Sequence, residues 1–579
     1  MTITKNQTSS ITAGTPPQGE RLRRVAEPIP GVVYPKQSEI DRYVAGGALG
    51  YETLVDGLKS VVRQHPDNVA LLGPKLRITY RKLDELSTRL AGAFLKQGLK
   101  PLDRVIYQLR DSEQLVISFF ACLKAGLIPI CTMAAHRERE IGYLANHGEA
   151  RLHIVQGDET EKFDSVAFAR KMQDVAPSLK LIMQVRGEPQ EGVLVQDALI
   201  ADTDLAEAET LLQHVKLDPF QVAVFQLSGG TTGVPKIIPR FHNEYLYNMR
   251  AVARWLDYRP DDVLFMPQPM VHNLNMGCCF GPFLMTGGTV TVTPDLLPET
   301  LISLIATTKP TWLMLGGPII ARLESAIHEG RVDLSNARGV IVANSAAKLQ
   351  KLLGVRTHNI FGITEGVITL THKDDAAEAH DTTNGRPVSE FDEIRILVPG
   401  TEQEAKPGEI GEPVFKGPYT IHGYYNAEER NRETFTSDGY YRSGDLMYTK
   451  LIDGKTYYVF CGRLKDLVSR GGEKINCEEV ELAVSGHPAV AAVAAIGYPD
   501  PVFDERLCVT LVLRDGFAAP TVAELGTFLQ DYGLAKFKWP ERIEVLEAFP
   551  LTASGKLSKE RLRELVKANV ERERAQQAN

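Results

Sequence analysis

The sequence is poor in cysteine for its length, and no two cysteines form a CxxC pair. Seven cysteines occur among 579 residues. An odd number without paired spacing disfavours both a disulfide framework and a zinc site. It fits a protein that works in the reducing cytoplasm. The seven are Cys122, Cys131, Cys278, Cys279, Cys461, Cys477 and Cys508.

Long apolar runs are also lacking. The longest candidate, residues 115–131, is interrupted by Lys124, Gly126 and Pro129, whereas a membrane span needs about 20 predominantly apolar residues. We therefore expect a buried helix followed by a buried strand there, and no membrane partner. The N-terminal residues 1–30 lack the apolar core of a signal peptide and are expected to be a flexible lead-in.

Positive charge is not in excess. The formal net charge is -8, which disfavours a nucleic-acid partner, because binding to phosphate backbones depends on lysine and arginine. Hydrophobic residues make up 43% and charged residues 24%, which is ordinary for a globular enzyme. The length exceeds that of a single compact core, so several domains are expected.

Short runs rich in valine, isoleucine and leucine alternate with helix-like stretches from residue 51 onward. This alternation favours an α/β architecture with largely parallel sheets. A helix is predicted at 80–97. The predicted strands are 105–109, 152–155, 181–185, 222–226 and 289–292.

The chain changes character after about residue 385, where frequent glycine, proline and tyrosine predict short strands and turns. A further break occurs at 462–472. The part beyond it predicts a compact α+β unit of about 110 residues, and its charged stretch 558–574 is expected to be a helix with a solvated face. The predicted domains are a flexible N-terminus at 1–30, a core at 31–463 and a C-terminal domain at 464–579.

A glycine- and threonine-rich string, SGGTTGVPK at 228–236, follows the predicted strand at 222–226. Glycines let the backbone turn sharply, and the N–H groups of such a turn form a nest for polyphosphate oxygens. The string is not a Walker A loop, which needs glycine directly before the lysine and serine or threonine after it. Taken alone, it also fits a generic turn. The candidate phosphate contacts are Ser228, Gly229, Gly230, Thr231, Thr232, Gly233 and Lys236.

Four further strings stand downstream in order: FGITEG (361–366), YRSGDL (441–446), GRLKDLVSRGGEKI (462–475) and PLTASGK (550–556). With SGGTTGVPK, they resemble the motifs of the adenylate-forming superfamily, which includes acyl-CoA synthetases, adenylation domains of nonribosomal peptide synthetases and luciferases. The resemblance extends from about residue 51 to residue 565. It implies a large N-terminal domain of layered α/β subdomains with a β-rich subdomain, and a small mobile α+β C-terminal domain.

This resemblance implies activation of a carboxylic acid by ATP, with release of pyrophosphate. The 228–236 string would hold the β- and γ-phosphates, and Thr364 the α-phosphate. Glu365 would bind Mg²⁺, a hard cation that prefers oxygen ligands; the alternative is an ordinary surface charge. The nucleoside contacts would be Ile360, Phe361 and Gly362 at the adenine, Asp445 at the ribose, and Arg463 at the ribose or phosphate.

The resemblance also implies a second half-reaction with a thiol. Lys556 would bridge the substrate carboxylate and the α-phosphate during adenylation; without its motif it would be taken for a solvated lysine. Rotation about Lys465, the implied hinge, would withdraw Lys556 and present another loop to the thiol. The residues of that loop are Arg470, Gly471, Gly472 and Lys474.

Within the superfamily, the chain resembles free-standing aryl-acid–AMP ligases, which activate 2,3-dihydroxybenzoate or salicylate and load an aryl carrier protein in siderophore assembly. The strings that carry this resemblance are FQLSGGTTG, KIIPRFHNEY, VHN, RGGEKI and KFKWPERIE. Asn273 would hydrogen-bond the ortho hydroxyl of the ring; a loop cap is its alternative role. The implied acid contacts are His272, Asn273, Cys278, Asn344, Ser345 and Ile368.

The identity of the acid stays open. Cys278 stands where dihydroxybenzoate enzymes carry serine and salicylate enzymes tend to carry cysteine, which favours a salicylate-like acid, although Cys278 could simply belong to the core. This sequence departs from the motifs of the aryl-acid–AMP ligases at Leu274 and Asn275, at 316–317 and at 343–345. Asn344 could select an extra polar substituent, so 2,3-dihydroxybenzoate, anthranilate and 3-hydroxyanthranilate remain alternatives.

The sequence is therefore compatible with three functions. The first is an aryl-acid adenylating enzyme that loads the phosphopantetheine of a carrier protein. The second is an aryl-CoA ligase, which shares the first step. The third is a non-catalytic nucleotide-binding protein, which predicts loss of the catalytic lysine or the metal ligand. Lys556 and Glu365 are both present, and this disfavours the third.

Overall fold

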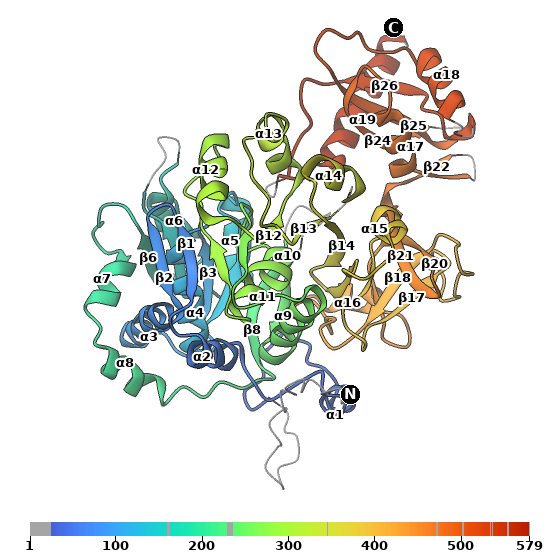
Figure 1. Cartoon of the computed structure of the whole chain (residues 1–579). Helices are drawn as coiled ribbons and strands as arrows, with labels where there is room; N and C mark the ends of the chain where they lie inside the picture. Colours follow the sequence, from blue (N-terminus) through green and yellow to red (C-terminus); the bar gives the residue numbers. More distant parts are fainter. Residues whose placement is uncertain are drawn as a thin grey trace, which may run out of the picture. The chain divides into compact units, whose positions relative to one another are not determined.

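The computed structural model describes residues 25–158, 163–228, 235–343, 346–470, 473–500, 503–532, 534, 536–552 and 555–577 (Figure 1). The chain forms two compact units. The first unit comprises Met1–Asp381, Gly385–Glu393 and Lys416–Phe435, and the second comprises Thr382–Asn384, Ile394–Phe415 and Thr436–Asn579. This division groups part of the β-rich segment with the C-terminal residues, and the domain boundary placed at 463 stays a prediction.

A seven-stranded sheet of the first unit has the order β7-β6-β5-β3-β4-β8-β9. All neighbouring strands are parallel except the last pair, β8 and β9. The strands are β3 (Arg104–Gln108), β4 (Ile128–Cys131), β5 (Leu152–Gln156), β6 (Leu181–Val185), β7 (Leu194–Val195), β8 (Val222–Ser228) and β9 (Lys236–Phe241). The intervening helices are α4 (Glu113–Lys124), α5 (Glu138–His147), α6 (Ser165–Val175), α7 (Gln196–Ala201) and α8 (Leu205–Leu212).

A nine-stranded sheet, also in the first unit, has the order β16-β15-β14-β13-β12-β10-β11-β1-β2. Its centre is parallel and its edges are antiparallel. The strands are β1 (Val69–Gly73), β2 (Leu76–Thr79), β10 (Val263–Phe265), β11 (Thr289–Thr291), β12 (Trp312–Met314), β13 (Gly339–Val342), β14 (Thr357–Ile363), β15 (Gly366–Leu370) and β16 (Arg386–Pro387).

Most of the other helices of the first unit pack against one of two apolar cores, a large one with side chains from both sheets and a smaller one that includes residues 301–305, 319–323 and 346–349. Side-chain caps begin several of them, for example Thr53 before α2 and Thr79 before α3, because these oxygens satisfy the first free N–H groups. These helices are α1 (Gln37–Ala45), α2 (Leu54–Gln64), α3 (Tyr80–Lys96), α9 (His242–Leu256), α10 (Asn273–Asn275), the π-helical η1 (Met276–Phe280), α11 (Gly281–Leu284), α12 (Pro298–Thr308), α13 (Gly317–His328), α14 (Ala346–Leu353), α15 (Ala377–Thr382) and α16 (Glu428–Thr434).

The second unit begins with short antiparallel strands and ends in a five-stranded sheet with helices (Figure 1). The short strands are β17 (Glu393–Leu397), β18 (Glu412–Lys416), β19 (Tyr441–Arg442), β20 (Asp445–Ile452) and β21 (Lys455–Arg463). The later elements are η2 (Leu464–Asp466), β22 (Leu467–Arg470), β23 (Glu473–Asn476), α17 (Cys477–Ser485), β24 (Val490–Asp500), β25 (Asp504–Leu513), α18 (Val522–Tyr532), η3 (Lys536–Lys538), β26 (Arg542–Val545) and α19 (Lys559–Gln577).

The predicted elements are confirmed in kind and nearly in extent, including the buried helix and strand within 115–131. The C-terminal helix also has a buried apolar face, which its largely charged sequence did not indicate. Leu562, Val566 and Val570 lie on one face of α19 and are buried against β24, so only the remainder of the helix is a solvated face. Among the described residues, no helix has both the length and the apolar character needed to cross a membrane.

Candidate active site

The two ends of the 228–236 string lie on the paired strands of a β-hairpin. Ser228 ends β8, Lys236 begins β9, and their Cα atoms are partners in the antiparallel register. The Ser228 hydroxyl is buried and has no hydrogen-bond partner among the described residues. Gly229, Gly230, Thr231, Thr232 and Gly233 lie outside the described residues. The pairing of the strands therefore fixes the two ends of the loop.

Lys236 is connected to Glu365 through a tyrosine. The Lys236 Nζ atom donates to the Tyr424 hydroxyl at 3.3 Å and lies 4.7 Å from the centre of its ring. The same hydroxyl donates to Glu365 Oε1 at 2.8 Å. Tyr424 is 2% exposed and Glu365 is 6% exposed, so Glu365 is not an ordinary surface charge. Tyr424 lies in the HGYYN string and was not assigned a role from the sequence.

The turn that carries Thr364 and Glu365 joins β14 to β15 and is held from two sides. The backbone N–H of Ile421 donates to the Glu365 carbonyl at 2.8 Å, and Arg240 donates to the Thr364 carbonyl at 2.9 Å. Gly366 has φ +135°, and a Cβ there would lie 2.5 Å from the Thr420 Cα atom. Only glycine fits this close approach. The geometry keeps the Glu365 carboxylate on the side of Lys236.

Arg240 itself is one half of a buried ion pair. Its Nε and Nη2 atoms donate to Glu244 at 2.9 and 2.8 Å, and the two side chains are 1% and 8% exposed. Burial disfavours the Arg240 charge, yet the Glu244 carboxylate raises the pKa of Arg240 above its ordinary value. Glu244 also accepts from the backbone N–H of Phe241. The pair thus joins the β9–α9 corner to the Thr364 turn.

The predicted adenine residues lie on β14. Ile360 is 2% exposed, whereas Phe361 is partly exposed and Gly362 is exposed. Gly362 is paired with Ile368 of β15, and a Cβ on Gly362 would lie 3.6 Å from the Ile368 side chain. The structure therefore places Ile368, a predicted acid contact, beside the predicted adenine strand.

The predicted acid contacts Asn273 and Cys278 lie in consecutive short helices, α10 and η1. His272 caps α10 by accepting from the backbone N–H of Leu274 at 3.3 Å. Asn273 therefore has a different role from the loop cap, and its Oδ1 accepts the Tyr245 hydroxyl at 2.8 Å. Asn344 and Ser345 lie outside the described residues.

Cys278 is 2% exposed and belongs to the large apolar core. Burial raises the pKa of the Cys278 thiol to about 12, so the side chain is a neutral and largely apolar group. Its assignment to the acid pocket remains a prediction. Two further polar residues near Asn273, Gln226 and Tyr245, lie in the strings FQLSGGTTG and KIIPRFHNEY but were not assigned a role from the sequence.

In the second unit, Asp445 and Arg463 meet at the open end of the β20–β21 hairpin. Their Cα atoms are register partners, and Arg463 Nε lies 3.4 Å from Asp445 Oδ1. The Asp445 side chain is 5% exposed and that of Arg463 is 52% exposed. Gly444, with φ +69°, makes the turn just before Asp445. The two predicted ribose residues are thus brought together.

The remaining predicted residues of this unit lie in separate places. Lys465 is exposed in η2, directly after β21. Arg470 makes a two-point contact with Glu541 at 2.7 and 3.1 Å. Gly471 and Gly472 lie outside the described residues, as does the side chain of Lys474. Lys556 is exposed on a tight loop, where its carbonyl accepts from the Thr552 N–H at 2.7 Å.

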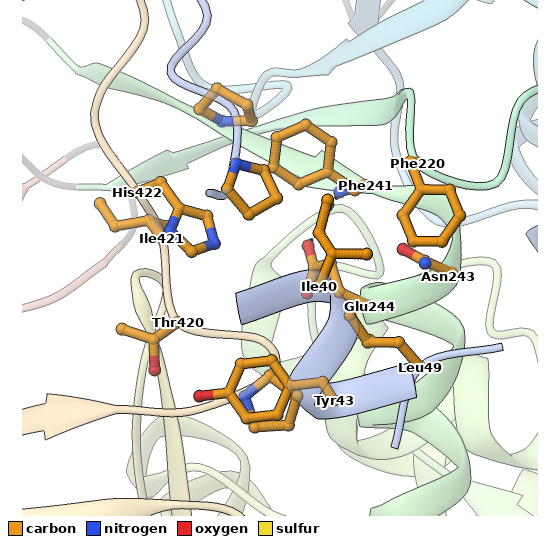
Figure 2. A pocket seen from close by; sticks show the side chains of 13 residues that line it. Ile40, Tyr43, Leu49, Phe220, Phe241, Asn243, Glu244, Thr420, Ile421 and His422 are labelled. Atoms are coloured by element: carbon orange, nitrogen blue, oxygen red, sulfur yellow. Dashed lines mark hydrogen bonds between the residues drawn. The ribbon is translucent and has the colours of Figure 1, made fainter. Parts of the chain in front are cut away.

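A separate pocket lies on the other face of Glu244, between α1 and the 418–422 segment. Figure 2 shows Ile40 and Tyr43 of α1 facing Thr420, Ile421 and His422 across it. The hydroxyls of Tyr43 and Thr420 are buried and have no hydrogen-bond partner among the described residues. Of the predicted acid and nucleotide contacts that the structure describes, none lines this pocket.

Comparison with known proteins identifies the family. The model of the AMP-binding enzyme family matches residues 58–425. The chain belongs to the AMP-binding enzyme family. The model of the AMP-binding enzyme C-terminal domain matches residues 479–556. As an AMP-binding enzyme, the protein uses ATP, and the predicted family and fold class are confirmed.

Named AMP-binding enzymes are similar to this chain over nearly their whole length. 2,3-dihydroxybenzoate-AMP ligase of Bacillus subtilis (strain 168) is 36% identical over 536 residues, covering 91% of this chain and 96% of that protein. Salicylyl-CoA synthase / salicylate adenylyltransferase of Streptomyces sp is 34% identical over 552 residues, covering 93% and 98%. The apo structure of MbtA from Mycobacterium smegmatis has TM-score 0.69 and 30% identity, covering 92% and 98%.

Proposed function

We propose that this AMP-binding enzyme uses ATP and Mg²⁺ to activate an ortho-substituted aryl carboxylic acid as its aryl adenylate, and then transfers the acyl group to the phosphopantetheine thiol of an aryl carrier protein. The meeting of Lys236 and Glu365 on the Tyr424 hydroxyl, at the end of the phosphate hairpin, carries this proposal. The aryl class is supported by relatives whose names specify 2,3-dihydroxybenzoate and salicylate.

Adenylation brings two anions together, so positioning and charge neutralisation govern its barrier. Lys236 supplies a cation at one end of the 228–236 string, and the Ser228 hydroxyl, which has no hydrogen-bond partner among the described residues, supplies a donor. Glu365 suits Mg²⁺, because this ion takes one or two protein carboxylates and completes its shell with water and phosphate oxygens. Bound to Glu365, Mg²⁺ would neutralise phosphate charge while Tyr424 keeps the carboxylate oriented.

Four further residues have proposed roles that follow from the chemistry of their side chains. Thr364, on the turn that Arg240 holds, is the proposed contact of the α-phosphate. Asp445, next to the Arg463 guanidinium, is the proposed acceptor of the ribose hydroxyls. Lys556 is the proposed cation between the substrate carboxylate and the α-phosphate. Asn273 is the proposed contact of the ortho substituent, supported by its fixed position against Tyr245.

An ATP–pyrophosphate exchange assay tests the first half-reaction. The acids are salicylate, 2,3-dihydroxybenzoate, anthranilate, 3-hydroxyanthranilate and benzoate. We expect exchange with one or more ortho-substituted acids and poor exchange with benzoate, because an unpaired buried amide at Asn273 penalises an acid without an ortho group. Absence of exchange with every acid would overturn the proposed function and revive a non-catalytic role.

The acceptor thiol needs its own experiment, because the salicylyl relative is named as a CoA synthase. The purified enzyme is supplied with ATP and the best acid, and then with either CoA or a phosphopantetheine-loaded aryl carrier protein. We expect acylation of the carrier protein. Efficient transfer to CoA with none to the carrier would make the protein an aryl-CoA ligase with the same first step.

A further inference from the structure

Three side chains form a chain of hydrogen bonds that ends at Asn273. Gln226 Nε2 donates to the Tyr245 hydroxyl at 3.3 Å, and this hydroxyl donates to Asn273 Oδ1 at 2.8 Å. Gln226 is 1% exposed, Tyr245 is fully buried and Asn273 is 8% exposed. The three residues come from β8, α9 and α10, so the contact arises only in the folded protein.

The Gln226 end of this series of hydrogen bonds determines which atom donates in each of them. Gln226 Nε2 also lies 3.1 Å from the Met276 sulfur, and a thioether can only accept. The amide nitrogen of Gln226 must therefore face the sulfur and the tyrosine. The tyrosine oxygen then accepts from Gln226, which leaves its proton for Asn273. Burial raises the pKa of Tyr245 well above its ordinary value, so this proton stays in place.

The tyrosine ring is held in position by its surroundings. The Arg240 guanidinium lies 4.6 Å from the ring centre. A Cβ on Gly277 would lie 3.4 Å from the ring, and the Gly277 carbonyl accepts from the Asn248 side chain at 2.9 Å. The ring thus lies against a charged side chain and close to the η1 backbone. Movement of the tyrosine oxygen away from Asn273 would need this packing to open.

Because its Oδ1 atom is turned toward the Tyr245 hydroxyl, Asn273 presents its amide nitrogen away from that hydroxyl. The Nδ2 atom has no hydrogen-bond partner among the described residues. We propose that Gln226 and Tyr245 are specificity-determining residues that fix Asn273 as a hydrogen-bond donor, and that the enzyme therefore selects acids whose ortho substituent is an acceptor. This inference rests on the proposed function and narrows the acid to the 2-hydroxyaryl carboxylates.

The ortho hydroxyl of salicylate and the ortho amino group of anthranilate differ in their ability to accept a hydrogen bond. In salicylate, the phenol proton is directed to the neighbouring carboxylate, which leaves the phenol oxygen free to accept from Asn273. In anthranilate, the nitrogen lone pair is delocalised into the ring, and the second N–H points outward. The anthranilate N–H and the Asn273 amide N–H then face each other, and neither finds an acceptor in a buried site. The acids are nearly isosteric, so hydrogen-bond polarity is the difference between them.

The wild-type enzyme gives the first test, by comparison of kcat/KM for salicylate and anthranilate in pyrophosphate exchange. We expect salicylate to be preferred by about 100-fold or more, as is typical where a buried polar group is left unpaired. Equal or better use of anthranilate would overturn the inference while leaving the proposed function intact. No exchange with any aryl acid would instead be a failure of the proposed function.

Tyr245→Phe removes the hydroxyl that orients Asn273, and the amide can then turn its oxygen to the acid. We expect the salicylate-to-anthranilate ratio to fall by about tenfold or more, while the KM for ATP stays within about twofold, since a lost hydrogen bond at the ring need not alter nucleotide binding. The matched control is Tyr247→Phe, on the same helix, which loses a 2.8 Å hydrogen bond to Ser389 instead. A merely structural tyrosine would leave the ratio unchanged in both variants, and that result contradicts the proposal.

Asn273→Asp provides a second variant that does not depend on the tyrosine. A carboxylate only accepts, so the polarity of the site is reversed. We expect anthranilate to become the better of the two acids in exchange. Retention of the wild-type preference for salicylate would show that Asn273 does not face the ortho substituent, and would overturn the inference even if Tyr245→Phe failed to fold.

Discussion

Tyr424 shows how one side chain can set the distance between two groups of opposite charge. Its hydroxyl accepts from the Lys236 ammonium and donates to the Glu365 carboxylate. A hydroxyl can do both at once, whereas a direct contact between lysine and glutamate would use up the charges that the phosphates and the metal ion need. We therefore propose that Tyr424 is a positioning residue, which would act on the nucleotide through Lys236 and Glu365.

We predict that Tyr424→Phe weakens metal-dependent nucleotide binding. Loss of the partner that orients a metal-binding carboxylate typically lowers metal affinity about 10- to 100-fold. The measurement is Mn²⁺ binding by electron paramagnetic resonance in the presence of a non-hydrolysable ATP analogue. Tyr425→Phe is the control, because its ring packs on Phe225 and not on Glu365. An unchanged Mn²⁺ affinity in Tyr424→Phe would argue against a positioning role.

The sequence contains these residues but does not show their contacts. Lys236 and Tyr424 are separated by 188 positions, and Glu365 and Tyr424 by 59. Periodicity and local motifs describe neighbours along the chain, whereas these contacts depend on how β9, the β14–β15 turn and a loop pack together. The motif residues Asp445 and Arg463 could be predicted because resemblance supplied them, and the hairpin that brings them together has a local register.

At the level of elements, the β9–α9 corner is the structural support of the proposed phosphate and acid sites. Arg240 lies at the end of β9, Glu244 lies in the first turn of α9, and Tyr245 follows it. The buried ion pair therefore supports the Thr364 turn on one side and the Tyr245 ring on the other. A buried charge that loses its partner is strongly destabilising.

We predict that Glu244→Gln lowers the free energy of unfolding by about 3–5 kcal/mol, because Arg240 remains charged and buried without its counterion. The measurement is denaturant unfolding followed in parallel by tryptophan fluorescence and circular dichroism. Glu207→Gln breaks the exposed Lys96–Glu207 pair and is the control; surface pairs contribute about 0–1 kcal/mol. Equal, small effects of both substitutions would contradict a supporting role of the buried pair.

Secondary structure followed well from the sequence where the pattern was strong. The apolar runs became buried strands of parallel sheets because both faces of those sheets are covered. The C-terminal helix was harder, since Leu562, Val566 and Val570 are spaced four apart within a largely charged stretch. Their burial depends on β24, a partner that local composition does not reveal.

At the scale of the whole molecule, the proposed chemistry is divided between the two compact units. Lys236, Glu365 and Asn273 belong to the first unit, whereas Asp445 and Lys556 belong to the second. The proposed phosphate contacts and the proposed catalytic cation thus lie in different parts of the chain, and substitutions can test them separately.

We predict that Lys556→Ala lowers pyrophosphate exchange by about 100-fold or more, because a cation that meets developing charge contributes on this order. ATP affinity measured by calorimetry should change by less than about threefold, since the phosphate contacts remain in place. Lys567→Ala, an exposed substitution in α19, serves as the control. Unchanged exchange in Lys556→Ala would remove Lys556 from the catalytic role.

The burial and protonation of the cysteines matter for an acyl adenylate, because this intermediate reacts with accessible thiolates. All seven thiols are unpaired, and six are buried. Burial raises the pKa of the Cys278 thiol to about 12, so this thiol stays protonated at neutral pH. A buried, protonated thiol is a poor nucleophile, so we do not expect Cys278 to capture the activated acyl group. We expect the burial of six of the seven sulfur atoms to limit internal competition with an incoming thiol for the acyl group.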